Sequence, residues 1–161
     1  VLISEKCYNV TLLNNLMYGG DYRNPAVGWA DKDNPDYPQA APGLVAEVVN
    51  NVIYKFGGYG TSIYWGAKGN VIGNWYWSDS GGTAFEVGDP ANLAQAYCNG
   101  NYRKGGSAPS GNTTSAFSVP SAAKVSATDA TSAANHVKAN AGCRIGGLDA
   151  TDQAMINDLT F

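Results

Sequence analysis

Short apolar segments interrupted by asparagine recur along the first two thirds of the chain. In each copy, apolar residues precede one or two asparagines, and further apolar or aromatic residues follow; the copies are 12–18, 48–54, 71–77 and, more weakly, 97–102. Successive copies are 36, 23 and 27 residues apart, measured at Asn15, Asn51, Asn74 and Asn101. A feature that returns at such intervals predicts a solenoid in which each turn of the chain is one repeat.

The residue types in these segments favour strands over helices. Val, Ile, Tyr and Trp crowd the segments, which are short and end at Gly, Asn, Asp or Pro, as strands bounded by turns do. Asn suits such a run if it occupies the same corner of successive turns. It tolerates left-handed backbone angles there, and its amide can hydrogen-bond to the copies above and below. The sequence therefore predicts stacked coils with an internal asparagine ladder; the alternative is a β-sandwich whose hairpin turns carry unrelated asparagines.

Composition bounds the class of protein. A length of 161 residues with 44% apolar residues suits one domain with its own core. The 20 glycines and a charged fraction of only 14% favour a secreted, extracellular, turn-rich β protein. The net charge of −3 and the lack of a basic stripe argue against nucleic acid as a partner. Every apolar run is shorter than a membrane-spanning segment, so we expect no membrane partner.

The composition changes after the fourth copy. Residues 104–127 are rich in Gly, Ser, Thr and Pro and predict an extended strap on the surface. A helix is expected over about 130–140, with Thr128 or Asp129 as its N-cap and Gly142 at its end, and a second over 149–159. We therefore expect one all-β domain in three parts, which are coils at 1–103, the strap at 104–127 and a helical segment at 128–161. The helical segment is expected to cover the side or the C-terminal end of the coils.

Three cysteines and two glycosylation triplets bear on the cellular compartment. The cysteines are too far apart in sequence for a zinc knuckle, and in a secreted protein two can pair while one stays free; they are Cys7, Cys98 and Cys143. The triplets that begin at Asn9 and Asn112 are acceptor sequences for N-linked glycans. Asn112 is the stronger candidate, because the Gly and Ser residues around it predict a loop.

A polar excursion between the first two copies carries three carboxylates. Its prolines mark a surface loop. The oxygen atoms of Asp31, Asp33 and Asp36 can together hold a hard cation such as calcium. The alternative is an acidic loop that is simply solvated.

Aromatic and basic residues near the middle of the chain are candidates for binding sugar. An aromatic ring covers the apolar side of a sugar, and the glycines around Tyr59, Tyr64 and Trp65 suggest an exposed turn. Lys55 and Lys68 can meet an anionic glycan. The alternatives are core packing for the aromatic residues and an ordinary solvated surface for the lysines.

Five segments together resemble the C-terminal portion of the pectate lyase-like family of polysaccharide lyases. The run 9–16, the Asp-Tyr-Arg-Asn-Pro segment at 21–25 and the strand at 48–54 are similar to the family's later coils. There, an Arg-x-Pro turn leads to a Val-x-Asn-Asn-aromatic strand. The Ala-rich segment 132–142, followed by Leu-Asp-Ala-Thr-Asp at 148–152, resembles the family's C-terminal helix and the turn after it. The resemblance covers most of the chain, and its specificity lies in the order of its parts.

This resemblance implies a right-handed parallel β-helix with a groove along one side, and calcium-assisted β-elimination of an acidic polysaccharide. It implies that Arg23 is the catalytic base, although an arginine stays protonated in water and depends on the fold and on calcium for that role. The chain departs from the family at 26–28, where it has Ala-Val-Gly and many relatives carry a second basic residue. The family's principal calcium ligands and an assisting lysine lie upstream of the matched region. Activity is therefore expected to be incomplete without an upstream segment.

The alternative function is a non-catalytic structural or carbohydrate-binding β-helix that assembles end to end into filaments. The sequence opens at 1–3 on a predicted strand, so the first coil is expected to present unpaired backbone groups and an open core. An upstream segment or a neighbouring subunit is expected to cover that end. The open end and the odd cysteine favour assembly, whereas the Arg-Asn-Pro turn favours the lyase.

Overall fold

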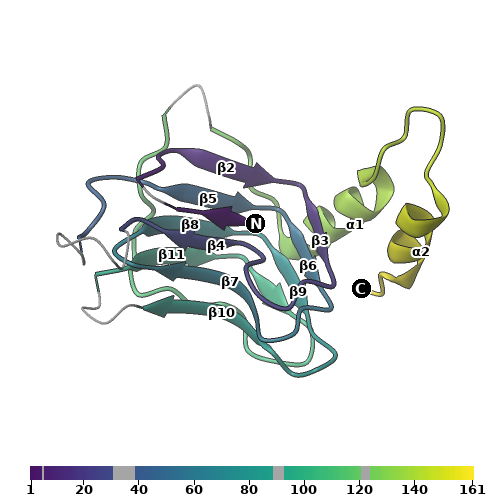
Figure 1. The fold of residues 1–161 in the computed structure, drawn as a ribbon, viewed down its shortest axis with the longest axis horizontal. Helices are drawn as coiled ribbons and strands as arrows, with labels where there is room; N and C mark the ends of the chain where they lie inside the picture. Colours follow the sequence, from purple (N-terminus) through teal and green to yellow (C-terminus); the bar gives the residue numbers. More distant parts are fainter. Residues whose placement is uncertain (5, 31–38, 89–92, 121–123) are drawn as a thin grey trace.

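The computed structural model describes residues 1–4, 6–30, 39–88, 93–120 and 124–161. Within these residues, twelve strands wind into four stacked coils of three strands each, and two helices follow (Figure 1). Coils 1 and 2 contain β1 (Leu2–Ile3), β2 (Val10–Leu13), β3 (Leu16–Tyr18), β4 (Ala26–Gly28), β5 (Ala46–Val49) and β6 (Val52–Tyr54). Coils 3 and 4 contain β7 (Tyr59–Tyr64), β8 (Lys68–Ile72), β9 (Trp75–Trp77), β10 (Thr83–Gly88), β11 (Gln95–Asn99) and β12 (Tyr102–Arg103).

Every third strand pairs in parallel, and the pairs build three sheets that run the length of the stack. Sheet A is β1-β4-β7-β10, sheet B is β2-β5-β8-β11 and sheet C is β3-β6-β9-β12. A β-sandwich of hairpins would need antiparallel neighbours, whereas the strand pairs here are parallel. The predicted β-solenoid is therefore confirmed.

The inside of coils 2 and 3 forms the core. Val48, Ile63 and Val71 are completely buried where sheets A and B face each other. A second buried cluster contains Phe56 and Tyr76, whose hydroxyl lies 3.0 Å from the Thr61 Oγ1. Burial of such apolar side chains is the main favourable contribution to folding. The partner for the Tyr76 hydroxyl removes the cost of burying it.

The asparagine ladder lies inside the corner between sheets B and C. The backbone N–H and the Nδ2 of Asn51 both donate to the Oδ1 of Asn74, at 2.9 and 3.0 Å. Asn15 makes the same pair of bonds to Asn51, and Asn74 makes it to Asn101. The predicted ladder is confirmed. Each rung satisfies a polar corner that water does not reach in the middle of the stack.

The left-handed residue at this corner is not the ladder asparagine, as the sequence analysis had it, but the residue before it. The φ angles are 56° at Asn14 and Asn50, 64° at Gly73 and 63° at Gly100. Asn and Gly are the residues that enter this region at least cost. The turn at this position also divides the first apolar run into β2 and β3.

The helices α1 (Ala130–Asn140) and α2 (Ala150–Asp158) cover the side of the solenoid at sheet C. Asp129 caps α1 by accepting a hydrogen bond from the Ser132 N–H at 2.9 Å, and Asp149 caps α2 in the same way. Ala134 and Val137 of α1 pack against Trp75, while the neighbouring Tyr76 faces the core, as strand alternation requires. None of the described helices is long and apolar enough to cross a membrane.

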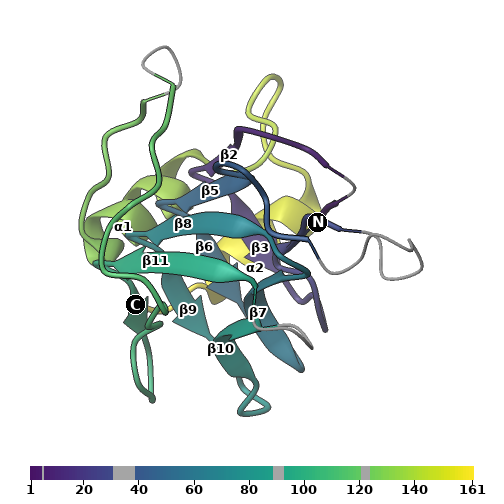
Figure 2. The same ribbon diagram turned by 90° about the vertical axis from the view of Figure 1, so that its left-hand side faces the viewer.

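The strap leaves coil 4 and returns along the outside of sheet B towards coil 2 (Figure 2). Asn112 holds it to coil 4, because its Oδ1 accepts from the Ala96 N–H at 2.8 Å. Further along, Phe117 and the Asn70 amide exchange two hydrogen bonds of 2.9 and 3.0 Å. Asn50 then accepts from the Thr128 N–H at 3.0 Å. Polar side chains of the strap and of coils 2 and 3 thus fasten this segment to the sheet.

The three cysteines are free thiols, of which Cys7 and Cys143 are exposed. Cys98 packs against the core, and burial raises the pKa of its thiol to about 12. Because the thiolate is the reactive form, we expect an alkylating reagent at about pH 8 to modify Cys7 and Cys143 quickly and Cys98 only after unfolding. Mass spectrometry of tryptic peptides measures this. Modification of Cys98 at the rate of the other two would contradict the packing described.

Candidate functional site

The turn at 19–25 presents Arg23 beside the outer face of sheet A. Arg23 is exposed and adopts a left-handed φ of 65°. The next residue, Asn24, fixes the turn, because its buried Nδ2 donates to the Gly20 carbonyl at 3.1 Å and to the Tyr59 carbonyl at 3.3 Å. The Asn24 carbonyl also accepts from the Thr61 Oγ1 at 3.2 Å. The guanidinium group therefore extends from a backbone that coil 3 holds rigidly.

Two further residues of this turn contact coil 3 or the turn that leads into it. The Asp21 Oδ1 accepts from the Gly58 N–H at 3.0 Å. The Tyr22 ring lies against the Tyr59 ring, with 4.9 Å between their centroids. A Cβ at Gly58 would lie 2.1 Å from the Tyr22 ring, so only glycine allows this approach. The sequence analysis did not identify Tyr22 as a site residue. Its position directly before Arg23 is the feature of the sequence that could have identified it.

Tyr64, the last residue of β7, and Trp65, which follows it in a turn, form the other aromatic part of the face. Their ring centroids are 4.4 Å apart, and both rings lie over Gly28, where a Cβ would come within 3.1 and 3.2 Å of them. Burial raises the pKa of Tyr64, and the positive charge of Arg23 opposes this rise. The sequence suggested an exposed turn around Tyr59, Tyr64 and Trp65. That interpretation is wrong for Tyr59 and Tyr64, because both belong to the partly buried strand β7. Trp65 does lie in a turn, but it is partly buried.

Ser62 lies between these aromatic residues on β7, and sequence reasoning missed it. Its neighbour Ile63 faces the core, so Ser62 lies on the opposite side, in a row with Ala26 and Glu86 on the adjacent strands. Ser62 is completely buried, yet its Oγ has no hydrogen-bond partner in the described part of the chain. A buried hydroxyl without a partner is uncommon and costs free energy. No sequence signal distinguishes it from other serines.

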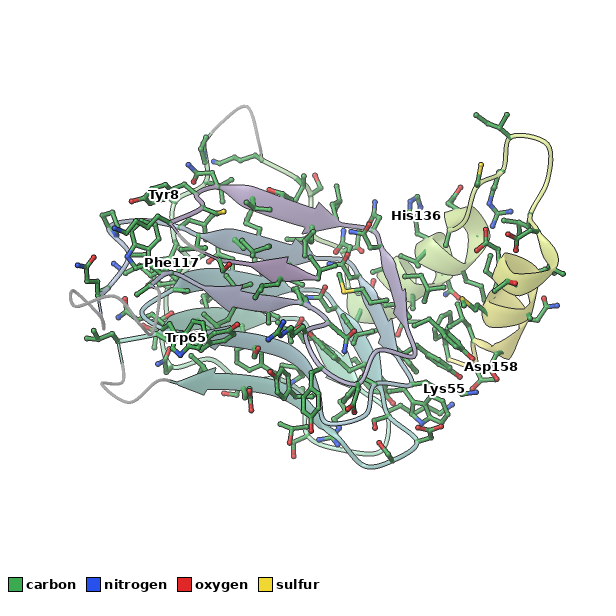
Figure 3. All side chains as sticks on the ribbon, in the orientation of Figure 1. Tyr8, Lys55, Trp65, Phe117, His136 and Asp158 are labelled. Atoms are coloured by element: carbon green, nitrogen blue, oxygen red, sulfur yellow. The ribbon has the colours of Figure 1, made fainter. Side chains whose placement is uncertain are left out.

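The predicted lysines do not join this face. Lys55 lies at the other end of the molecule from Trp65 (Figure 3), where its Nζ is 2.8 Å from the Asp158 Oδ2 at the end of α2. It also lies over the Tyr18 ring, 5.7 Å from the centroid. Lys68 begins β8, in sheet B. The structure thus brings together Arg23 and its aromatic neighbours and leaves Lys55 in a contact that fastens α2.

The Lys55 contact makes the attachment of α2 sensitive to pH. The hydrogen bond from Lys55, followed by that from Tyr18, lowers the pKa of Asp158 below its ordinary value of 3.8. Because the pKa of Asp158 is lower in the folded protein than in the unfolded chain, the ionised carboxylate stabilises the folded state. This stabilisation is complete when the pH is above the ordinary pKa, and it is lost as the pH falls through the lowered pKa. We expect the amides of α2 to lose protection from hydrogen exchange, relative to those of α1, between about pH 5 and about pH 3. Asp158→Asn is the control, and a pH response that persists in it would contradict this role.

The remaining predicted sites have no further support. Among the described residues, no group of three or more His, Cys, Asp or Glu could hold a metal ion. Asp31, Asp33 and Asp36, the predicted calcium ligands, lie outside the described residues. Asn9 is exposed, and the Asn112 amide donates to the Ala94 carbonyl at 2.9 Å. Glycosylation of either asparagine stays a prediction.

Comparison of the chain with models of known protein families, with curated proteins and with solved structures finds no match. A functional assignment therefore depends on the residues of the chain itself.

Proposed function

We propose that this chain is the C-terminal part of a pectate lyase-like enzyme and binds an acidic polysaccharide on the outer face of sheet A. The observation that carries the proposal is the position of Arg23 on a rigid turn. The charge of Arg23 acts on the pKa of Tyr64, and the residues on either side of Arg23 contact Tyr59. A guanidinium matches a carboxylate with two parallel N–H donors, and aromatic rings take the apolar face of a sugar. A uronate residue presents both a carboxylate and an apolar ring face to such a site. The proposal implies a secreted protein.

The proposed reaction is β-elimination. A base removes the proton from the carbon beside the uronate carboxylate, and the electron pair of that C–H bond forms a double bond in the ring. The glycosidic C–O bond breaks, and its oxygen takes a proton. Positive charge at the carboxylate stabilises the negative charge that develops, and Arg23, which is protonated in water, supplies it. The role of Arg23 as the base follows from the family resemblance alone.

Calcium enters this proposal only through the resemblance. The described residues do not fit a calcium site, because they bring no cluster of carboxylates together. No step above therefore depends on a metal that these residues hold. The principal calcium ligands and the assisting lysine are expected on an upstream segment.

The proposal is tested with polygalacturonate, added calcium and the polypeptide purified from its natural source. We expect the polypeptide from its natural source to release unsaturated product, recorded as ultraviolet absorbance. We expect the 161-residue chain to bind the polymer with little cleavage. Neutral dextran is the matched control polymer. A natural polypeptide that neither cleaves nor binds polygalacturonate would contradict the proposal.

A second candidate function is the non-catalytic β-helix that assembles end to end. The observation in its favour is the edge of coil 1, where β1, β2 and β3 each pair on one side only in the described structure. The strap opposes it, since it lies along β11 at the other end, where Thr113 pairs with Tyr97. Electron microscopy of the purified chain distinguishes filaments from single molecules.

A further inference from the structure

The outer face of sheet A carries a row of residues that the proposed function does not use. Ala26, Ser62 and Glu86 are register partners on β4, β7 and β10, which lie side by side (Figure 1). Ile63 and Val87, the next residues on β7 and β10, pack in or against the core, so Ser62 and Glu86 face outwards. The row thus lies on the face proposed to bind polysaccharide.

Two opposite charges at this face belong to different strands. Arg23 precedes β4, and its positive charge acts on the pKa of Tyr64, against the rise that burial causes. Glu86 lies on β10, two strands away, and is exposed. Neither Arg23 nor Glu86 forms an ion pair with another described residue. A polysaccharide that crosses the strands would therefore meet a positive charge at one position and a negative charge at another.

The Ser62 hydroxyl lies beside Glu86 and lacks a partner. Ser62 is completely buried, and no hydrogen bond satisfies its Oγ in the described part of the chain. A buried hydroxyl in this state costs free energy, so a group that supplies a hydrogen bond there is bound favourably. Such a group reaches Ser62 only when a neighbouring side chain moves aside. A sugar hydroxyl can both donate and accept, so it can satisfy the Ser62 hydroxyl in either direction.

The spacing of these residues matches neighbouring units of one polysaccharide. Ser62 lies two residues before Tyr64 on β7, a distance of roughly 6–7 Å along the strand. Glu86 lies on the next strand, about 4.8 Å from Ser62. Each of these steps is comparable with the size of one pyranose ring. A sugar over Ser62 and Glu86 is therefore the neighbour of one whose carboxylate meets Arg23.

Glu86 disfavours a second carboxylate at this neighbouring position. Like charges repel each other through the solvent when they lie within a Debye length, which is about 10 Å at 0.1 M salt. A neutral sugar meets no such repulsion, and its hydroxyls can donate to the Glu86 carboxylate. A site that repels the wrong ligand gains specificity even where its attraction to the right one is modest.

We propose that the row formed by Ala26, Ser62 and Glu86 is a subsite for an uncharged sugar, next to the uronate at Arg23. The ligand is then a polysaccharide that alternates uronate with neutral sugar units, rather than one built of uronate alone. The inference rests on the proposed function, because it takes the uronate at Arg23 from it. It adds the chemical class of the neighbouring unit.

The test is isothermal titration calorimetry of the 161-residue chain with two oligosaccharides of equal length. One contains galacturonate alone, and the other alternates galacturonate with rhamnose. At low salt, we expect the alternating oligosaccharide to bind about tenfold more tightly, and we expect the difference to shrink as salt is added. Glu86→Gln should abolish the difference by tightening the binding of the oligogalacturonate. Asp152→Asn removes an equal charge from α2 and should preserve the difference.

The outcomes separate this inference from the proposed function. Equal binding of the two oligosaccharides, unchanged in Glu86→Gln, would overturn the subsite and leave the acidic-polysaccharide proposal intact. Binding of neither oligosaccharide would overturn both. Loss of the difference in Asp152→Asn as well would reveal a general charge effect and would overturn the role of Glu86.

Ser62→Ala tests the hydroxyl separately from the charge. In the free chain, we expect the urea midpoint to stay the same or rise, because the substitution removes a buried hydroxyl that has no described partner. Binding of the alternating oligosaccharide is expected to weaken by about threefold to tenfold, the value of one hydrogen bond. Unchanged binding in this variant would contradict the contact between Ser62 and the neutral sugar.

Discussion

Replacing Asn74 by alanine is expected to lower the free energy of unfolding by roughly 3–5 kcal/mol, a large part of the stability of a domain of this size. Asn74 is completely buried, and its Oδ1 accepts from both the N–H and the Nδ2 of Asn51. Its own Nδ2 donates to the Val48 carbonyl at 2.7 Å and to Asn101 at 3.0 Å. Alanine leaves these groups buried without this partner, in a corner that solvent does not reach. Urea unfolding followed by tryptophan fluorescence measures the change.

Asn15→Ala is the matched control for this prediction. Asn15 is exposed and donates to Asn51, but its Oδ1 accepts from no described residue. Its loss is expected to cost about 1 kcal/mol in the 161-residue chain. Equal effects of the two substitutions would mean that the ladder does not hold the stack together.

Removing the Arg23 side chain is expected to weaken the binding of polygalacturonate by about tenfold to 100-fold. In the natural polypeptide, the release of unsaturated product is expected to fall by about 100-fold or more, because the developing negative charge loses its partner. The variant of choice is Arg23→Gly, since the φ of 65° at this position suits glycine. Binding to immobilised polygalacturonate and ultraviolet absorbance measure the two effects.

Two controls separate the charge of Arg23 from its backbone. Arg23→Ala removes the same guanidinium but costs about 1 kcal/mol of stability more than glycine, because alanine enters the left-handed region at a cost. The two variants should therefore bind polygalacturonate equally weakly while they differ in urea midpoint. Arg144→Gly removes an equal charge from the exposed segment between α1 and α2, and it should leave binding unchanged. A loss of binding in Arg144→Gly would indicate a general charge effect.

The parts of the fold that repeat once per coil could be predicted from the sequence. Asn51 and Asn74 recur in the same context, so their spacing revealed the stack and the ladder before any coordinates. Capping by Asp129 follows from local rules in the same way. The left-handed residue before each ladder asparagine could not be assigned, because the pairs Asn-Asn and Gly-Asn allow either position to take that conformation.

The candidate site was less predictable, because contacts distant in sequence decide it. The partner of Lys55 is Asp158, which the chain brings back from its far end, and no local pattern announces that pair. Arg23 was found through the motif around it, but Tyr22 and Ser62 were not. The burial of the Ser62 hydroxyl without a partner depends on the rows of sheet A, which only the register of β4, β7 and β10 defines.

Binding of an acidic polysaccharide by sheet A is tested most directly by nuclear magnetic resonance. The labelled 161-residue chain is titrated with short oligogalacturonates, and the shifts of backbone amides and of arginine Nε–H groups are followed. The predicted result is a set of shifts confined to Arg23, Tyr59, Tyr64 and their strand neighbours, absent in Arg23→Gly. Shifts gathered around Lys55 and α2, or no shifts at ligand concentrations that saturate the natural polypeptide, would contradict the assignment of this face.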